Sequence, residues 1–268
     1  MLGGWEFDNA RRLARDLVKR FGVEAPMHVN VEGFAARLGF KISLAVLNGA
    51  IAQLVVRAGH RPLILLSDRL TDPAMRRFTV AHELGHYLLR HPSPSIAEMY
   101  DPTQLHGLAS LLGSVYEAEA NAFARELLMP EPLVRLACDL TSASLDPALR
   151  IAYTFGVSVP TSAVRFAELT DIACTVVLSE GGLVRWSAPH PAFPGRVAFR
   201  RQVDQRSLAW DYFERGTLCS GVEHVPAAAW LDDAAEGPLL EHSIASHERG
   251  TVLTLLSLPA HHRAHLAA

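Results

Sequence analysis

One five-residue segment constrains this chain more than any other part of its sequence: His82-Glu83-Leu84-Gly85-His86. Histidines four residues apart on a helix share one face, with Cβ atoms about 5–6 Å apart, so both imidazoles can reach one ion. The flanking residues from Phe78 to Leu89 are apolar nearly all round, which predicts a buried helix. Buried histidines are costly unless they are paired. The segment therefore favours a metal site over the alternative, two histidines satisfied by hydrogen bonds in the core.

The same segment indicates what chemistry the site can support. A catalytic zinc site has three protein ligands and one open position, and His82 and His86 supply two of the three ligands. Glu83 can hold a metal-bound water and accept its proton as a general base. Gly85 costs the helix about 1 kcal/mol relative to alanine, which indicates that another backbone approaches it closely. We expect zinc at this site, with manganese as the alternative.

The third ligand must come from elsewhere, and the next helical segment offers several side chains. The candidates are Glu98, Asp101, His106, Glu117, Glu119 and Glu126. Glu117 and Asn121 are four residues apart and share a helical face, so Glu117 can bind the ion while the Asn121 amide supports a ligand histidine. Glu119 points roughly 200° away, toward the side of Glu126, and we expect that side to face solvent. The spacing favours Glu117, with Glu119 as the alternative.

His91 follows the second histidine of the motif by five residues and lies on a different helical face. We expect it only to interact with the helix dipole at the end of the helix. The histidines at 261, 262 and 265 lie in a polar C-terminal stretch, and we expect them to be solvated.

The first half of the chain alternates helical and extended patterns. We expect helices over 5–21, over 30–39 with Asn30 as its N-cap, over 72–90 and over 114–129. We expect strands over 41–47, 50–57 and 62–67. Asn48-Gly49 predicts a hairpin between the first two strands, and the Pro- and Gly-containing stretch 92–113 predicts a loop.

Residues 133–168 read as helix, break, helix, turn, helix, with the turn at Gly156-Val157-Ser158. This pattern resembles a helix-turn-helix. Its three arginines are balanced by two aspartates and one glutamate, whereas readers of DNA need cationic contacts to phosphates. We therefore expect a structural bridge or a substrate-docking module that does not bind DNA.

The rest of the chain has an α+β pattern. Strands are expected over 173–179, 183–188, 197–200, 218–225 and 251–258, and a helix over 207–215. The three cysteines, Cys138, Cys174 and Cys219, are odd in number and far apart, which excludes a disulfide framework. We expect reduced, buried thiols.

Composition and sequence pattern limit the expected cellular compartment and binding partners. The net charge of −3 does not indicate a basic surface that would bind nucleic acid or an acidic membrane. The N-terminal stretch has no apolar core typical of a secretion signal, and no run of about 18 apolar residues is present. We expect a cytoplasmic protein that does not span a membrane.

Three segments together resemble one known family, the ImmA/IrrE metallopeptidases. They are Arg77–His86, Glu117–Ala124 and Leu127–Pro130. The resemblance is strong over 60–135 and weaker beyond, and the longer arrangement is similar to the IrrE branch found in radiation-tolerant bacteria. It implies Glu117 as third metal ligand, Glu83 as catalytic residue and a helix-turn-helix repressor as substrate. One departure is the spacing before Glu117, which predicts a longer loop over 92–113.

We therefore expect an α+β protein in three parts. Residues 1–132 form a zincin-like metallopeptidase domain and 133–169 a small all-α helix-turn-helix-like segment. Residues 170–268 form an α+β domain, which the resemblance implies is a GAF-like sensor domain.

The expected function is that of a zinc-dependent endopeptidase, which the resemblance implies cleaves an XRE-type helix-turn-helix repressor and so derepresses stress and DNA-damage genes. One alternative is a DNA-binding transcription regulator with a structural metal site. Another is a phage-immunity or toxin–antitoxin protease. Glu83 favours a peptidase over a structural site, because a structural site needs no general base and is closed by a fourth ligand.

Overall fold

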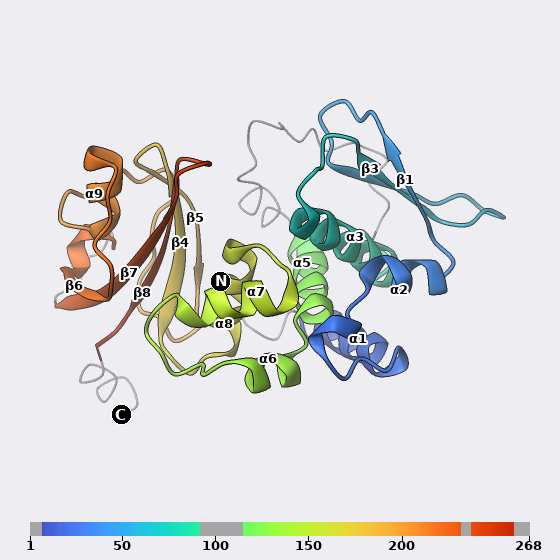
Figure 1. Ribbon diagram of the computed structural model, residues 1–268, viewed down its shortest axis with the longest axis horizontal. Helices are drawn as coiled ribbons and strands as arrows, with labels where there is room; N and C mark the ends of the chain where they lie inside the picture. The colour runs from blue at the N-terminus through green and yellow to red at the C-terminus, as the bar shows by residue number, and fades with distance from the viewer. Residues whose placement is uncertain (1–6, 92–114, 232–236, 260–268) are drawn as a thin grey trace. The chain divides into compact units, whose positions relative to one another are not determined.

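The structure is a computed structural model that describes residues 7–91, 115–231 and 237–259 (Figure 1). The chain divides into two compact units, Met1–Ala137 with Ile151–Ser158, and Cys138–Arg150 with Val159–Ala268. The expected division into three parts at 132/133 and 169/170 stays a prediction. The loop expected over 92–113 and the histidines at 261, 262 and 265 lie outside the described residues.

The first unit is mainly helical. Its helices are α1 (Asp8–Arg20), the 3-10 helix η1 (Pro26–His28), α2 (Val31–Arg37), α3 (Pro73–Leu88), α5 (Val115–Leu128) and α6 (Glu131–Ala137). The expected cap at Asn30 is present, since its side chain accepts from Gly33 N at 2.9 Å. Asp72 also caps α3, accepting from Ala74 N at 2.8 Å. Both caps satisfy amides that a helix N-terminus leaves free.

A small sheet completes the first unit, with strands β1 (Lys41–Ala45), β2 (Ala52–Val55) and β3 (Leu63–Ser67). Its order is β1-β3-β2, with β3 parallel to β1 and antiparallel to β2. The hairpin predicted at Asn48-Gly49 is therefore wrong, because β1 and β2 do not pair. The most apolar strand, β3, lies at the centre of the sheet, where Ile64 and Leu66 are fully buried. The hairpin instead joins β2 to β3, through the turn at Gly59 (φ +75°).

The second unit is built on a five-stranded antiparallel sheet in the order β5-β4-β8-β7-β6. Its strands are β4 (Cys174–Glu180), β5 (Leu183–Pro189), β6 (Glu223–Pro226), β7 (Pro238–Ser246) and β8 (Thr251–Ser257). Its helices are α8 (Val159–Leu169), α9 (Leu208–Arg215) and the 3-10 helix η2 (Ala227–Ala229), and it shares α7 (Asp146–Phe155) with the first unit. Helix α8 packs on β4 and β5, and α9 packs on β7 and β8.

Two strand predictions for the second unit are corrected. The segment 197–200 forms no strand. Arg200 N donates to Val184 O, but the one isolated bridge near it pairs Leu183 with Gln202, outside the segment. Conversely, β7 was not predicted, because Glu241 and His242 interrupt its apolar pattern. The fully buried Glu241 carboxylate is satisfied by Ala209 N at 3.0 Å and Trp230 Nε1 at 2.8 Å, so the strand tolerates it.

The cysteines are free, as expected, but only Cys174 is buried; Cys219 is exposed and precedes β6. The prediction of a core thiol on a strand at that position is therefore wrong. In the ranges described, no helix is long and apolar enough to cross a membrane.

Candidate metal site

Helices α3 and α5 run against each other and carry the candidate site (Figure 1). They approach closely at Gly85, where an added Cβ would lie 3.0 Å from Phe123 Cδ1 and 3.2 Å from Ala120 Cα. Small residues at such a crossing let two helix backbones come together. The expectation that another backbone approaches Gly85 is confirmed.

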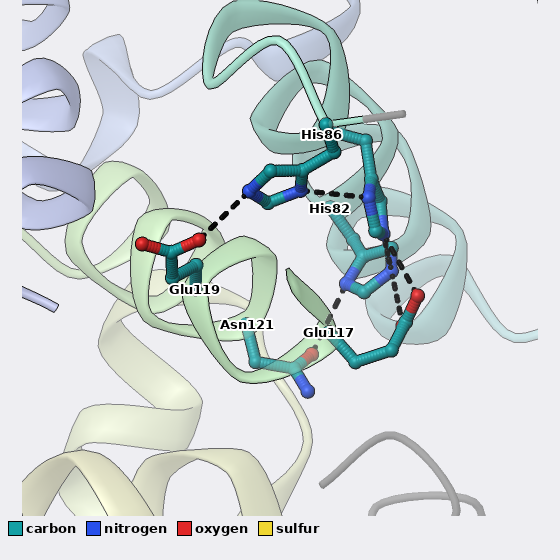
Figure 2. Close-up of polar contacts among 6 residues, drawn as sticks. His82, His86, Glu117, Glu119 and Asn121 are labelled. Carbon is teal, nitrogen blue, oxygen red and sulfur yellow. Dashed lines mark hydrogen bonds and ion pairs between the residues drawn. The ribbon is translucent and has the colours of Figure 1, made fainter. Parts of the chain in front are cut away.

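Three of the predicted site residues converge on one point. The Nε2 atoms of His82 and His86 lie 2.9 Å apart, and they lie 3.1 Å and 3.2 Å from the two carboxylate oxygens of Glu117. The histidines are only 7% and 6% exposed. All three ligand atoms fall within 4.8 Å of one another, so the group can hold a metal ion (Figure 2).

Asn121 stands behind one of the histidines. Its Oδ1 lies 3.1 Å from His82 Nδ1, and the whole residue is buried. An amide oxygen accepts from a ring N–H, which leaves the other ring nitrogen of His82 free to face the ion. The structure thus places Asn121 where the sequence spacing suggested, four residues beyond Glu117 on the same helix face.

The other histidine has a partner that the sequence analysis missed. His91 Nδ1 lies 2.9 Å from His86 Nδ1, and His91 Nε2 lies 3.0 Å from Glu119 Oε2. The predictions that His91 only caps the helix and that Glu119 faces solvent are therefore wrong. Glu126 is also buried, at 1% exposed, and accepts from Glu131 N. Helical spacing alone did not show that His91, three residues beyond the end of α3, lies against α5.

The two acids of the site have shifted pKa values. Burial raises the pKa of Glu83, although His82 and His86 oppose the shift. Burial alone would also raise the pKa of Glu117, but hydrogen bonds with His82 and His86 hold it well below its usual range. Glu117 is therefore an ionised carboxylate suited to a cation, whereas Glu83 is a stronger base than an exposed glutamate.

Comparison with known proteins assigns the family. Residues 36–166, which include the three converging side chains, match the family model described as the IrrE N-terminal-like peptidase domain. These residues therefore form a peptidase domain of the ImmA/IrrE type. The match runs from the last two residues of α2 into α8, so this domain includes most of the segment that resembles a helix-turn-helix.

Two of the proteins to which this chain is similar illustrate the resemblance. The radiation response metalloprotease IrrE of Deinococcus radiodurans is 31% identical over 71 residues, which are 26% of this chain and only 20% of that relative. A Mycobacterium tuberculosis transcriptional regulator has a similar fold, with a TM-score of 0.57 and 14% identity, over 97% of this chain and 90% of that one. At that identity the second likeness concerns the fold alone.

Proposed function

We propose that this protein is a zinc-dependent endopeptidase. The observation that carries the proposal is the convergence of His82, His86 and Glu117 on one point, beside a glutamate whose pKa is raised. Three ligands with a fourth position open are the pattern of catalytic rather than structural zinc sites. Among the described residues, no fourth histidine, cysteine or carboxylate joins the group, which favours a catalytic role.

The chain's own residues divide the work. His82, His86 and Glu117 would hold the ion, and Asn121 orients His82. Zinc supplies Lewis acidity, lowering the pKa of a water molecule and polarising a carbonyl oxygen. Glu83 follows His82 directly and is half-buried, and it would accept the proton of the attacking water and later give it to the leaving amine.

The proposed substrate is a helix-turn-helix repressor of the XRE type, whose cleavage would derepress stress and DNA-damage genes in the cytoplasm. The match of residues 36–166 to the IrrE N-terminal-like domain supports this proposal, as does the likeness to a radiation response metalloprotease. A phage-immunity or toxin–antitoxin protease would use the same site on a different partner.

DNA binding by the helix-turn-helix-like segment is not favoured. The single cation of α8, Arg165, is 1% exposed and pairs with Glu168 at 3.2 Å. A recognition helix needs exposed cations and polar side chains to reach phosphates and base edges. We propose that this segment has a structural or docking role.

We also propose that the first unit is zincin-like and the second a GAF-like sensor domain. The packing of α3 on β2 and β3, with α5 packed against α3, supports the first assignment. A single antiparallel sheet with α8 and α9 packed on it supports the second.

The test is to incubate the zinc-loaded protein with the repressor encoded beside its gene and to analyse the products by mass spectrometry. The expected result is one major cleavage that a chelator abolishes.

Glu83→Gln should keep the ion and lose at least about 100-fold in rate, because an amide cannot accept the proton. Glu131→Gln on α6 is the matched control, and it should cleave normally. An uncut repressor under every metal condition would refute the substrate class, and normal turnover of Glu83→Gln would remove Glu83 from the mechanism.

A further inference from the structure

The end of α3 directs a third histidine back toward the site. Arg90 N donates to Tyr87 O at 3.1 Å and His91 N donates to His86 O at 3.0 Å, which together form a Schellman motif. Glycine usually occupies the left-handed position of this motif, but here it is Arg90, with φ +58°. That conformation costs a non-glycine residue about 1–2 kcal/mol, so contacts elsewhere must hold the turn in place.

The contacts of the His91 side chain stabilise the turn at Arg90. Its Nδ1 lies 2.9 Å from His86 Nδ1 and its Nε2 lies 3.0 Å from Glu119 Oε2. Its ring centroid is 4.8 Å from that of Tyr116, and the side chain is only 3% exposed. Both ring nitrogens of His91 are therefore engaged, one toward a ligand histidine and the other toward a carboxylate.

The directions of these hydrogen bonds follow from the ligand role of His86. If His86 offers Nε2 to an ion, its proton must sit on Nδ1, and His91 Nδ1 must accept it. His91 then carries its own proton on Nε2 and donates it to the carboxyl oxygen of Glu119, which accepts it. The chain of hydrogen bonds thus runs one way, from His86 through His91 to Glu119.

We infer that His91 and Glu119 are positioning residues for His86, which fix its ring and the tautomer that presents Nε2 to the metal. The inference rests on the proposed metal site. It also makes the two ligand histidines unequal, because the neutral amide of Asn121 supports His82, whereas a carboxylate supports His86 through an imidazole (Figure 2). Partners of this kind orient a ligand and raise its basicity.

The experiment measures zinc affinity of the full chain by competition with a chromophoric chelator. His91→Phe keeps a ring beside Tyr116 but can neither accept nor donate, and it should weaken zinc binding about 10- to 100-fold. His91→Gln keeps an acceptor and a donor and should restore part of the loss. Glu119→Gln, which is isosteric, should weaken binding about 10-fold, while Glu131→Gln should bind as the parent protein does.

A second measurement separates positioning from simple stability. The ¹⁵N shifts of His86 should report a proton on Nδ1 in the parent protein and a mixture of tautomers in His91→Phe, with both metal-free proteins folded. Affinities within twofold of the parent in His91→Phe and Glu119→Gln would overturn the inference alone. A parent protein that binds no zinc, or one that keeps its affinity after Glu117→Ala, would overturn both the inference and the proposed metal site. If His91→Phe binds zinc more weakly only because less of the protein is folded, His91 stabilises the fold and does not position His86, and the inference is again overturned.

Discussion

Single residues decide which groups meet at the candidate site. Glu117 and Glu119 are two positions apart on α5, yet one faces the two motif histidines and the other faces His91. A shift of two residues turns a helix by about 200°, so the two carboxylates lie on opposite sides of α5. The structure thus gives each carboxylate a different imidazole partner, and neither is left to solvent.

The distinction predicts unequal effects of removing the two carboxylates. Glu117→Ala deletes a proposed ligand of the ion. It should therefore weaken zinc binding more than substitution of His91 or Glu119 does, for which the expected loss is about 10- to 100-fold. The measurement is the chelator competition described above, with Glu119→Gln in parallel. Equal affinities of the Glu117→Ala and parent proteins would show that the ion binds elsewhere.

At the scale of elements, the crossing of α3 and α5 sets the spacing of the site. Ala120 and Phe123 pack against Gly85, which lies one residue before His86. A methyl group at Gly85 would require Phe123 and the Ala120 backbone to give way by a few tenths of an ångström. Movement of the α5 backbone in this way would increase the separation of His86 from Glu117.

Gly85→Ala should therefore affect metal binding more than folding. Alanine favours the helix by about 1 kcal/mol over glycine, which offsets part of the cost of crowding Ala120. We expect a modest change in the midpoint of thermal unfolding but a clear loss of zinc affinity. An unchanged affinity would show that the crossing has room for a methyl group.

A second close contact fixes the other end of α3. Arg77 donates to Phe155 O and Val29 O, both at 3.0 Å, and a Cβ at Gly156 would lie 2.7 Å from Arg77 Nη1. Gly156 also has φ +61°, which favours glycine. The turn that resembled part of a helix-turn-helix therefore serves to anchor the helix that carries the histidines.

At the scale of the whole molecule, the chain passes between its two units three times: after Ala137, within the continuous helix α7 and again after Ser158. In the second unit, the amide of Leu145 at the start of α7 donates to His242 Nδ1 on β7 at 2.9 Å. This bond joins residues 97 positions apart in the sequence. It requires a neutral imidazole, because a protonated ring has no acceptor.

Stability should consequently depend on pH through His242. Burial lowers the pKa of His242, against the attraction of Asp146, so the folded chain binds the proton more weakly than the unfolded chain. The stabilisation is present above the unfolded pKa of about 6.5 and is lost as pH falls through the lowered folded value. The slope attributable to this residue is at most about 1.4 kcal/mol per pH unit.

Urea unfolding at a series of pH values checks this expectation. His242→Asn keeps an oxygen that can accept from Leu145 N but does not titrate, so its free energy of unfolding should fall less between about pH 7 and pH 5 than that of the parent. Parallel curves for the two proteins would assign the acid sensitivity to other groups.

The sequence by itself determined the helices that carry the site and the residues that converge there. The spacing of His82 and His86, the caps at Asn30 and Asp72, and the shared face of Glu117 and Asn121 are local properties, governed by helical geometry within a few residues. For that reason the structure, with the ligand atoms within 4.8 Å of one another, agrees with a reading made from spacing alone.

Only the tertiary structure decided the pairings between distant segments. The parallel pairing of β1 with β3 joins residues 22 positions apart, His91 reaches Glu119 across 28 positions, and Ala209 N reaches the buried Glu241 of β7 across 32. Periodicity shows which face of an element is apolar but not which element covers it. A buried polar group such as Glu241 is tolerated where donors from distant segments form hydrogen bonds with it. Those hydrogen bonds form only once the chain has folded.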